Sequence, residues 1–130
     1  MSTRRSFEVP GLEHVNPIPM GSIIGNLMMT SGIFGMDPAT RRAPDDIDGQ
    51  CRQMFENIRH VMAAAGGSPD DIIKVVVWAK DRSFKDAVNK EWLLMFPDEH
   101  SRPARHTMMY DSFGGNVLVQ CELTAVLRKT

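Results

Sequence analysis

The feature that most constrains this sequence is a run of β-branched and apolar residues, IIKVVVWAKD, at residues 72–81. Side chains that branch at Cβ favour extended backbone and pack well in a sheet. A run with so few polar interruptions predicts a central strand. Just before it, SPDD places Ser68 as a cap and Pro69 at the first helical position, which predicts a single helical turn that leads into the strand.

Two helical patterns flank this strand. The first predicts a helix of about five turns that starts from a cap at Asp45 or Asp46 and ends at Gly66-Gly67. The second predicts a helix over residues 83–96, with Ser83 and Asp86 in capping-box spacing. The first apolar stripe consists of Ile47, Cys51, Met54, Phe55, Ile58, Val61, Met62 and Ala65, and the second of Phe84, Ala87, Val88, Trp92 and Met95.

Further strands are predicted near both ends of the chain. Residues 5–9 favour a short strand, residues 10–19 carry three prolines and favour an extended segment, and residues 22–32 favour a hairpin around Gly25-Asn26. After a loop over residues 34–46 and the elements above, residues 105–127 predict two strands joined around Gly114-Gly115. The order predicts an α+β fold in which two helices cover one face of a mixed sheet.

Length and charge narrow the classes of protein that remain. A chain of 130 residues suits one domain over residues 1–130. The net charge is −1 and no run of basic residues exceeds two, so nucleic-acid binding has no electrostatic support. No apolar stretch is long enough to span a membrane, and the first residues lack the apolar region of a signal peptide, so we expect a cytoplasmic protein.

The residues that commonly bind metals show no ligand spacing. Cys51 and Cys121 fall in a predicted helix and a predicted strand, and neither has a neighbouring Cys or His at metal-binding distance in the sequence. We therefore expect two reduced, buried thiols. The four histidines show no ligand spacing among themselves either, so the residues predict no metal site.

Two charged residues on the last two strands need a partner or water. Strand alternation places Arg105 on one face with Thr107 and Met109, and it places Glu122 in the middle of the final strand, opposite an apolar row. One interpretation is a cross-strand ion pair between Arg105 and Glu122. The other is a small polar pocket that receives an anion.

Several segments together resemble one known family over nearly the whole chain. They are NPIPMGSIIGNLMMTSG, MDPAT, QCRQMFENIRHVMAAAGGSPDDIIKVVVWAKD, AVNKEW, RPAR and VQCELTAV. Their order and spacing resemble the Rid (reactive intermediate deaminase, YjgF-like) family, most specifically in TSG at Thr30 to Gly32, DPAT at Asp37 to Thr40, and PAR at Pro103 to Arg105.

This resemblance implies a chorismate-mutase-like (YjgF-like) fold assembled as a homotrimer, with a central barrel and clefts between subunits. It implies a hydrolase that converts reactive enamine or imine acids to 2-keto acids and ammonia without a metal or an organic cofactor. By the same resemblance, Arg105 binds the substrate carboxylate, Glu122 orients or activates water, and Ser31 and Asn89 lie at polar positions near the cleft. A bidentate guanidinium suits a planar carboxylate, which agrees with this role for Arg105.

Two positions depart from the family pattern. Ile18 stands where active deaminases of the family usually have a tyrosine. His106 and Thr107 stand where small serine and cysteine residues are common. Ile18 and Thr107 would line the substrate site. We therefore keep open a substrate larger than 2-aminoacrylate, such as an aminomuconate-like acid, and a non-catalytic or regulatory trimer that binds small carboxylates. An RNA-cleaving or chaperone-like activity is a further alternative within the family.

Methionines are frequent on the segments that would border the barrel and the cleft. The residues concerned are Met20, Met28, Met29, Met108 and Met109. Thioether chains adapt to irregular shapes, so these residues could either fill the core or line a binding surface. Core packing is the interpretation that we favour.

Overall fold

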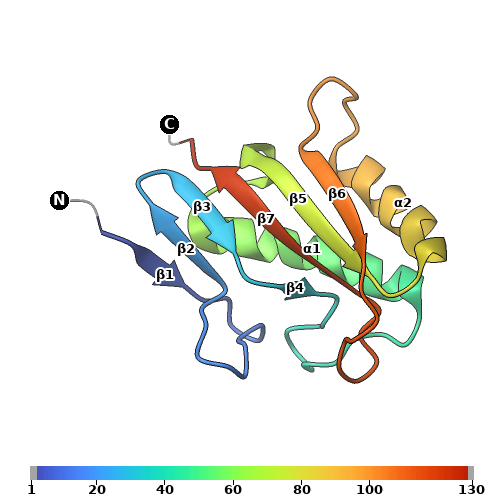
Figure 1. Ribbon diagram of the computed structural model, residues 1–130. Coiled ribbons are helices and arrows are strands. Elements are labelled where there is room, and N and C mark those ends of the chain that lie inside the picture. The colour runs from blue at the N-terminus through green and yellow to red at the C-terminus, as the bar shows by residue number, and fades with distance from the viewer. Residues whose placement is uncertain (1–2, 129–130) are drawn as a thin grey trace.

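A computed structural model describes residues 3–128 and shows a two-layer α+β fold (Figure 1). One mixed sheet forms the first layer, and both helices lie on the same face of it. The strand order is β1-β2-β3-β7-β5-β6, and β4 pairs with β7 beyond the end of β3. The predicted α+β class, with two helices on one face of a mixed sheet, is confirmed.

The sheet combines strand pairs that are close in sequence with pairs that are distant. Their bounds are β1 Arg5–Phe7, β2 Gly21–Ile24, β3 Leu27–Thr30, β4 Ile33–Phe34, β5 Ile72–Ala79, β6 Ala104–Met109 and β7 Val119–Val126. All pairings are antiparallel except that of β5 with β6. The predicted hairpin is present, and Gly25 takes the positive φ of 61° that its turn requires. β5 lies between β6 and β7 as an interior strand, as predicted.

Helix α1 spans Ile47–Ala65, and both of its ends match the predicted caps. Asp46 is the N-cap, because its side chain accepts a hydrogen bond from the Gly49 N–H at 2.9 Å. Gly66 ends the helix in the left-handed region, and the Gly67 N–H donates to the Met62 carbonyl. The predicted single turn is also present as the 3-10 turn η1, Pro69–Asp71.

Helix α2 spans Lys85–Met95 and starts differently from the prediction. A 3-10 turn, η2 at Arg82–Phe84, precedes it, and the Asp81 side chain accepts from the Ser83 N–H at 2.8 Å. Ser83 is therefore inside this turn, and the predicted capping box of Ser83 and Asp86 is wrong. An aspartate immediately before the turn can accept the first free N–H, so the stabilising residue lies two positions earlier than expected.

One predicted strand is shorter in the structure, and one strand of the structure was not predicted. β1 ends at Phe7, although residues 5–9 were expected to be extended, because only residues 5–7 pair with β2. β4 was not predicted at all. It contains only Ile33 and Phe34, which pair with Cys121 and Gln120 of β7, and two residues are too few to show an alternating pattern.

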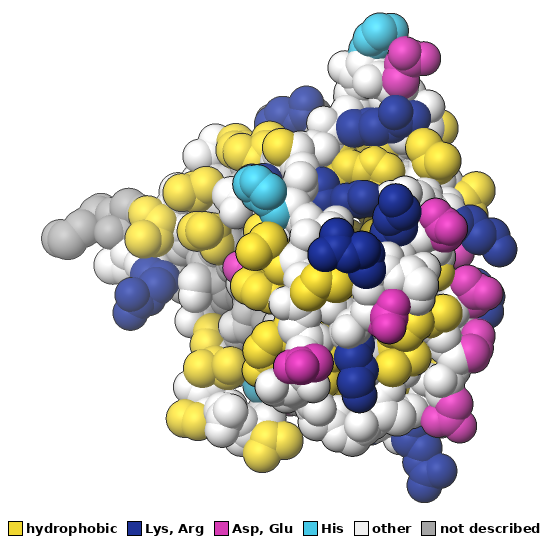
Figure 2. Space-filling view, turned by 45° about the vertical axis from the view of Figure 1, so that its right-hand side comes forward, with side chains coloured by type: hydrophobic (Ala, Val, Ile, Leu, Met, Phe, Trp, Pro, Cys, Tyr) yellow, Lys and Arg dark blue, Asp and Glu magenta, His cyan; other side chains and the backbone are white. Residues whose placement is uncertain are grey.

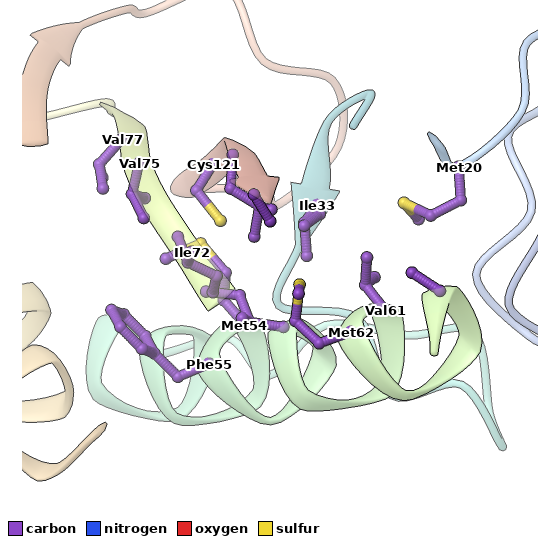
Figure 3. Close-up of a cluster of buried hydrophobic side chains, with 14 of the residues drawn as sticks. Met20, Ile33, Met54, Phe55, Val61, Met62, Ile72, Val75, Val77 and Cys121 are labelled. Atoms are coloured by element: carbon purple, nitrogen blue, oxygen red, sulfur yellow. The ribbon is translucent and has the colours of Figure 1, made fainter. Parts of the chain in front are cut away.

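The hydrophobic core lies between α1 and the sheet, as Figure 3 shows. Met54, Ile58 and Met62 on α1 have no exposed surface and pack toward Val75 and Cys121 on the central strands. The favoured interpretation of the methionines is confirmed for Met20 and Met28, which are buried. It is wrong for Met29, Met108 and Met109, which are between 44% and 56% exposed.

Both cysteines are free and buried, as predicted. Burial is the main reason that the pKa of Cys51 rises to about 12, and the charges of Glu91 and Asp48 add to it. Burial likewise raises the pKa of Cys121. Both thiols therefore stay protonated at neutral pH, which makes them poor nucleophiles. Among residues 3–128, no helix is long and apolar enough to cross a membrane.

Two buried amides on α1 attach the irregular segments of the chain to the helix. The Asn57 side chain donates at 2.7 Å to the carbonyls of Phe34 and Met36 and accepts from Gln53 at 3.0 Å. Gln50 similarly bonds to the carbonyls of Pro44 and Asn116 and to the Leu118 N–H. Because both amides are completely buried, these hydrogen bonds replace the water that the loop carbonyls would otherwise need.

We predict that Asn57→Ala lowers the free energy of unfolding by about 2 kcal/mol, because two buried carbonyls lose their donor. Urea unfolding followed by circular dichroism measures this change. Glu56→Ala is the matched control, since the neighbouring Glu56 side chain is 54% exposed and should tolerate truncation. Equal stability losses in the two variants would contradict the role of Asn57.

Candidate functional site

Arg105 points to the helix-covered side of the sheet. It is the second residue of β6, and the parallel register places it beside Val75 of β5, whose side chain is 1% exposed and lies in the core. Residues that are direct neighbours on adjacent strands share a face. The Arg105 side chain therefore extends between β6 and α2.

Helix α2 holds the Arg105 guanidinium with two side chains. Its Nη2 donates to the Asn89 amide oxygen at 2.6 Å, and its central carbon lies 4.8 Å from the centroid of the Trp92 ring. Asn89 and Trp92 are three residues apart, so one helical face presents both. An aromatic face attracts a cation, and the contact restricts how the guanidinium can turn.

The other terminal nitrogen of Arg105 has no hydrogen-bond partner among residues 3–128. Nη1 is buried and forms no hydrogen bond with any residue of the described chain. Burial lowers the pKa of Arg105, yet an arginine remains charged at any ordinary pH. A half-buried charge with an unused donor is costly, which indicates a partner that is not part of this chain.

Thr107 lies next to Arg105 on the same face. It is two residues further along β6 and is half-buried, in agreement with the predicted alternation. The structure thus brings together three of the predicted site residues: Arg105, Asn89 and Thr107. Because β6 is an edge strand, this group lies at the rim of the sheet.

Glu122 points to the opposite face of the sheet. It lies beside Val76 of β5, and its β7 neighbours Cys121 and Leu123 are the residues that face the core. Its carboxylate accepts a hydrogen bond at 2.9 Å from the Trp78 indole N–H. Of the two interpretations, the ion pair between Arg105 and Glu122 is therefore wrong. The alternation was correct for each strand, but the register between strands assigns the two charges to different faces.

Glu122 lines a small hollow on this open face. The hollow has a volume of about 230 Å³, and its walls are Trp78, Tyr110, Gln120 and Glu122. The Tyr110 ring meets the Trp78 ring edge to face at a centroid distance of 6.2 Å, and Phe113 packs against Tyr110 at 4.9 Å. A carboxylate beside aromatic walls can be oriented and partly shielded from water.

Ser31 and Ile18 lie in the segments next to the open face. The Ser31 hydroxyl donates to the Pro19 carbonyl at 2.8 Å, so it holds the segment that carries Ile18. Gly32, which follows Ser31, lies against the Gln120 side chain, because a Cβ at position 32 would be 3.1 Å from the Gln120 amide nitrogen. Ile18 is 44% exposed. Ser31 is therefore connected through Gly32 to Gln120, which lines the hollow of Glu122.

Sequence reasoning missed Trp78 and Tyr110, and it missed the contact of Trp92 with Arg105. The alternation in residues 72–79 places Trp78 on the same face as Val76, so the side of the sheet that Trp78 faces could have been predicted. Its contact with Glu122 also depends on the register of β5 against β7, which links residues more than 40 positions apart. Tyr110 follows the last residue of β6, where strand periodicity no longer applies.

The surface around α2 and β6 is rich in positive charge. Figure 2 brings this side forward and shows several Lys and Arg side chains near the middle of the view, with apolar side chains between them. Most Asp and Glu side chains in this view lie toward its right-hand edge. Such an arrangement favours the approach of a small anion.

A larger hollow of about 690 Å³ lies beside the N-terminal segment, with His14, Phe34 and Arg41 among its lining residues. Arg41 forms an ion pair with Glu13 at 2.9 Å, so this charge is already neutralised. No group of three or more His, Cys, Asp or Glu residues within residues 3–128 is arranged to hold a metal ion. The unpaired guanidinium of Arg105 is thus a better indication of a site than the size of this hollow.

Together, the fold and the two groups define an α+β protein with a half-buried guanidinium on one face of its sheet and a carboxylate on the other. Comparison with known proteins identifies the family. A family model described as Endoribonuclease L-PSP matches residues 15–127, which is most of the chain. The chain belongs to this family, the Rid or YjgF-like family, as the resemblance implied.

Relatives with assigned names include deaminases. A 2-iminobutanoate/2-iminopropanoate deaminase of Escherichia coli K12 is 30% identical over 115 residues, which covers 88% of this chain and 90% of that protein. A RutC family protein of Haemophilus influenzae is 33% identical over 114 residues, which covers 86% of this chain and 88% of that protein. Among solved structures, RidA of an Antarctic Psychrobacter superimposes with a TM-score of 0.87 at 26% identity, covering 95% of this chain and 99% of that one.

We predict that Arg105→Ala lowers the free energy of unfolding by only about 1 kcal/mol, because the residue contacts a neutral amide and an aromatic ring. Arg105→Met is the matched variant, since it keeps an apolar stem on Trp92 and should lose still less. Thermal and urea unfolding measure both. A loss of about 3 kcal/mol or more, the size expected when a buried carboxylate loses its cation, would contradict this geometry.

Proposed function

We propose that this protein is a deaminase that hydrolyses reactive imine or enamine acids to 2-keto acids and ammonia. The observation that carries the proposal is the Arg105 guanidinium, which Asn89 and Trp92 hold in place while a buried nitrogen remains without a partner. The E. coli relative named as an iminobutanoate and iminopropanoate deaminase supports the same chemistry.

Arg105 would bind the carboxylate that every such substrate carries. A guanidinium and a carboxylate are both planar and can form two parallel hydrogen bonds, which sets the direction of the bound acid as well as its position. The substrate carboxylate would compete with Asn89 for the guanidinium donors or add to that contact. Thr107, on the same face of β6, would line the site beside it.

Glu122 would act on the water that attacks the imine carbon. Hydrolysis joins the water oxygen to the C=N carbon and releases the nitrogen as ammonia, so a carboxylate that accepts a proton from water assists the step. Ser31 would order the neighbouring wall through its bond to Pro19, and Ile18 would provide an apolar surface. None of these roles requires a metal or an organic cofactor.

A site that uses both Arg105 and Glu122 requires more than one copy of the chain. The two residues lie on opposite faces of the same sheet, so neither can reach the ligand of the other within one subunit. The open face also exposes Ile24, Leu27 and Met29, which lie on β2 and β3. We therefore propose the homotrimer that the family resemblance implies, with each cleft formed between neighbouring subunits.

A second candidate is a non-catalytic trimer that binds small carboxylates. Position 18 is an isoleucine, so the hydroxyl that the resemblance leads one to expect there is absent. Such a trimer would keep the Arg105 anchor and bind keto acids without turning over an imine. RNA cleavage, which the description of the family model names, has little support from a chain with a net charge of −1.

The proposed activity is tested by adding the protein to a dehydratase that releases imines from amino acids and by following keto acid and ammonia. We expect faster release than the spontaneous rate with at least one of the serine-, leucine- or aminomuconate-derived imines. Arg105→Ala should abolish the effect. Arg105→Lys should lower kcat/KM at least about tenfold, because an ammonium keeps the charge but loses the paired geometry.

Arg59→Lys serves as the control for this series, because Arg59 is an exposed residue on α1 whose side chain is 51% accessible. It should leave the rate unchanged. Tight binding of 2-keto acids by the wild-type protein with no acceleration for any imine would reject the deaminase and favour the non-catalytic trimer.

We also predict that the protein in solution has three times the mass of one chain. Light scattering coupled to size-exclusion chromatography at micromolar concentration measures the mass. Leu27→Glu, which places a charge on the open face opposite Val126, should shift the protein toward monomers without unfolding it. A wild-type monomer would exclude a site shared between subunits.

A further inference from the structure

The indole N–H of Trp78 donates a hydrogen bond to the Glu122 carboxylate. Trp78 lies on β5 opposite Gln120, two residues along β7 from Glu122, and its N–H bonds to one carboxylate oxygen, Oε1, at 2.9 Å. The other oxygen of Glu122 has no hydrogen-bond partner among the described residues. A carboxylate that is held by one oxygen turns less freely, so its second oxygen faces a defined direction.

Tyr110, the residue directly after β6, lines the same hollow. Its backbone N–H bonds to the Ala79 carbonyl at 2.9 Å, and its ring lies between the rings of Trp78 and Phe113. The residue is nevertheless 44% exposed, and we find no hydrogen bond from its hydroxyl to any residue of the described chain. Tyr110, with an unused O–H, and Glu122, with an unused carboxylate oxygen, therefore both line the hollow.

We propose that Trp78 and Tyr110 complete the reacting end of the site: Trp78 is a positioning residue that orients Glu122, and Tyr110 is a catalytic residue that donates from its hydroxyl to the imine nitrogen. This inference rests on the proposed function. It adds two residues that neither the sequence patterns nor the names of the relatives assign. The acid would enter with its carboxylate toward Arg105 of a neighbouring subunit and its imine toward this hollow.

The proposed hydrolysis begins with the attack of water on the imine carbon. The free oxygen of Glu122 takes a proton from water while the water oxygen bonds to the imine carbon and the C=N π bond breaks. The electron pair of that bond moves to nitrogen, which accepts a proton from the Tyr110 hydroxyl. Glu122 then returns its proton to the tyrosinate through water. In the collapse of the carbinolamine, Glu122 accepts the proton of the new hydroxyl and the Tyr110 hydroxyl protonates the amino nitrogen, so that the C–N bond breaks, the C=O bond forms and ammonia leaves. A second proton return from Glu122 to the tyrosinate restores both residues.

The size of the hollow agrees with a site that receives only the imine end of the substrate, while Arg105 of a neighbouring subunit binds the carboxylate. At about 230 Å³ it is smaller than the pockets that enclose whole ligands of drug size, but it has room for a water molecule and an imine group. Aromatic side chains form two of its four walls.

The test compares the full-length wild-type protein with Trp78→Phe, Tyr110→Phe, Glu122→Gln and the double variant Trp78→Phe/Glu122→Gln. Turnover of dehydratase-generated imines gives kcat and KM, and calorimetry gives the affinity for 2-oxobutanoate. We expect both aromatic variants to lose about tenfold or more in kcat, because they remove groups that act in the transition state. KM and 2-oxobutanoate affinity should stay within about twofold, since Arg105 provides the binding.

The double variant separates positioning from a structural role. If Trp78 acts through Glu122, then Trp78→Phe should cost little further activity once Glu122 is already glutamine. A residue that only stabilises the fold would reduce activity in both backgrounds by the same factor. Thr124→Val is the matched control, because Thr124 lies on the same face of β7 two residues from Glu122 and does not line the hollow. It should behave as wild type.

If the wild-type protein hydrolyses an imine, three results would overturn this inference and leave the proposed function standing. They are unchanged kcat in both aromatic variants, a loss confined to KM and 2-oxobutanoate affinity, and equal effects of Trp78→Phe in the two backgrounds. A wild-type protein that hydrolyses no imine would instead reject the proposed function, and this inference with it. If Trp78→Phe fails to assemble, Tyr110→Phe decides the matter, because it removes a single oxygen and leaves the aromatic packing intact.

Discussion

The structure depends on one strand, β7, and on the strict alternation of its side chains. β7 pairs with β3, β4 and β5, so it joins the N-terminal hairpin to the strand-helix-strand unit. Cys121 and Leu123 on one side are buried under α1, while Gln120 and Glu122 on the other remain partly exposed. Because the period of a strand is two, the packing of the core also fixes which polar residues reach the open face.

The same constraint explains why the two charged residues are separated. β5 and β6 are parallel, and the connection between them is α2, which covers the core side of β6. Arg105 shares that side with Val75 and therefore meets α2, where Asn89 and Trp92 hold it. Glu122 shares the other side with Trp78. Each residue is held by its neighbours, and their positions on opposite faces of the sheet are the main physical argument for the proposal that neighbouring subunits form the site together.

Local patterns predicted what depends on neighbours in sequence. The stripe of α1, its caps at Asp46 and Gly66, the hairpin at Gly25 and the faces of β7 all follow from periodicity and turn chemistry. Patterns failed where pairing over long distances decides the outcome. The pairing of β5 with β7 places Glu122 on the face of Trp78 and not on that of Arg105. The two residues of β4 are too few to show a strand pattern, and only their pairing with β7 defines them as a strand. The start of α2 was misplaced because Asp81 and Ser83 are both plausible caps, and only the backbone decides between them.

The position of the hollow between a rigid strand and a loop has a consequence for how the family can diversify. An insertion of one residue in β7 would reverse every side chain and expose the core, so this strand can change only by substitution. The loop over residues 110–118 is mostly exposed, carries Gly115 with a positive φ, and supplies Tyr110 and Phe113 to the aromatic wall. Changes in its length would reshape the wall and leave the strand intact. The shape of the hollow can therefore change through this loop at little cost to the stability of the sheet.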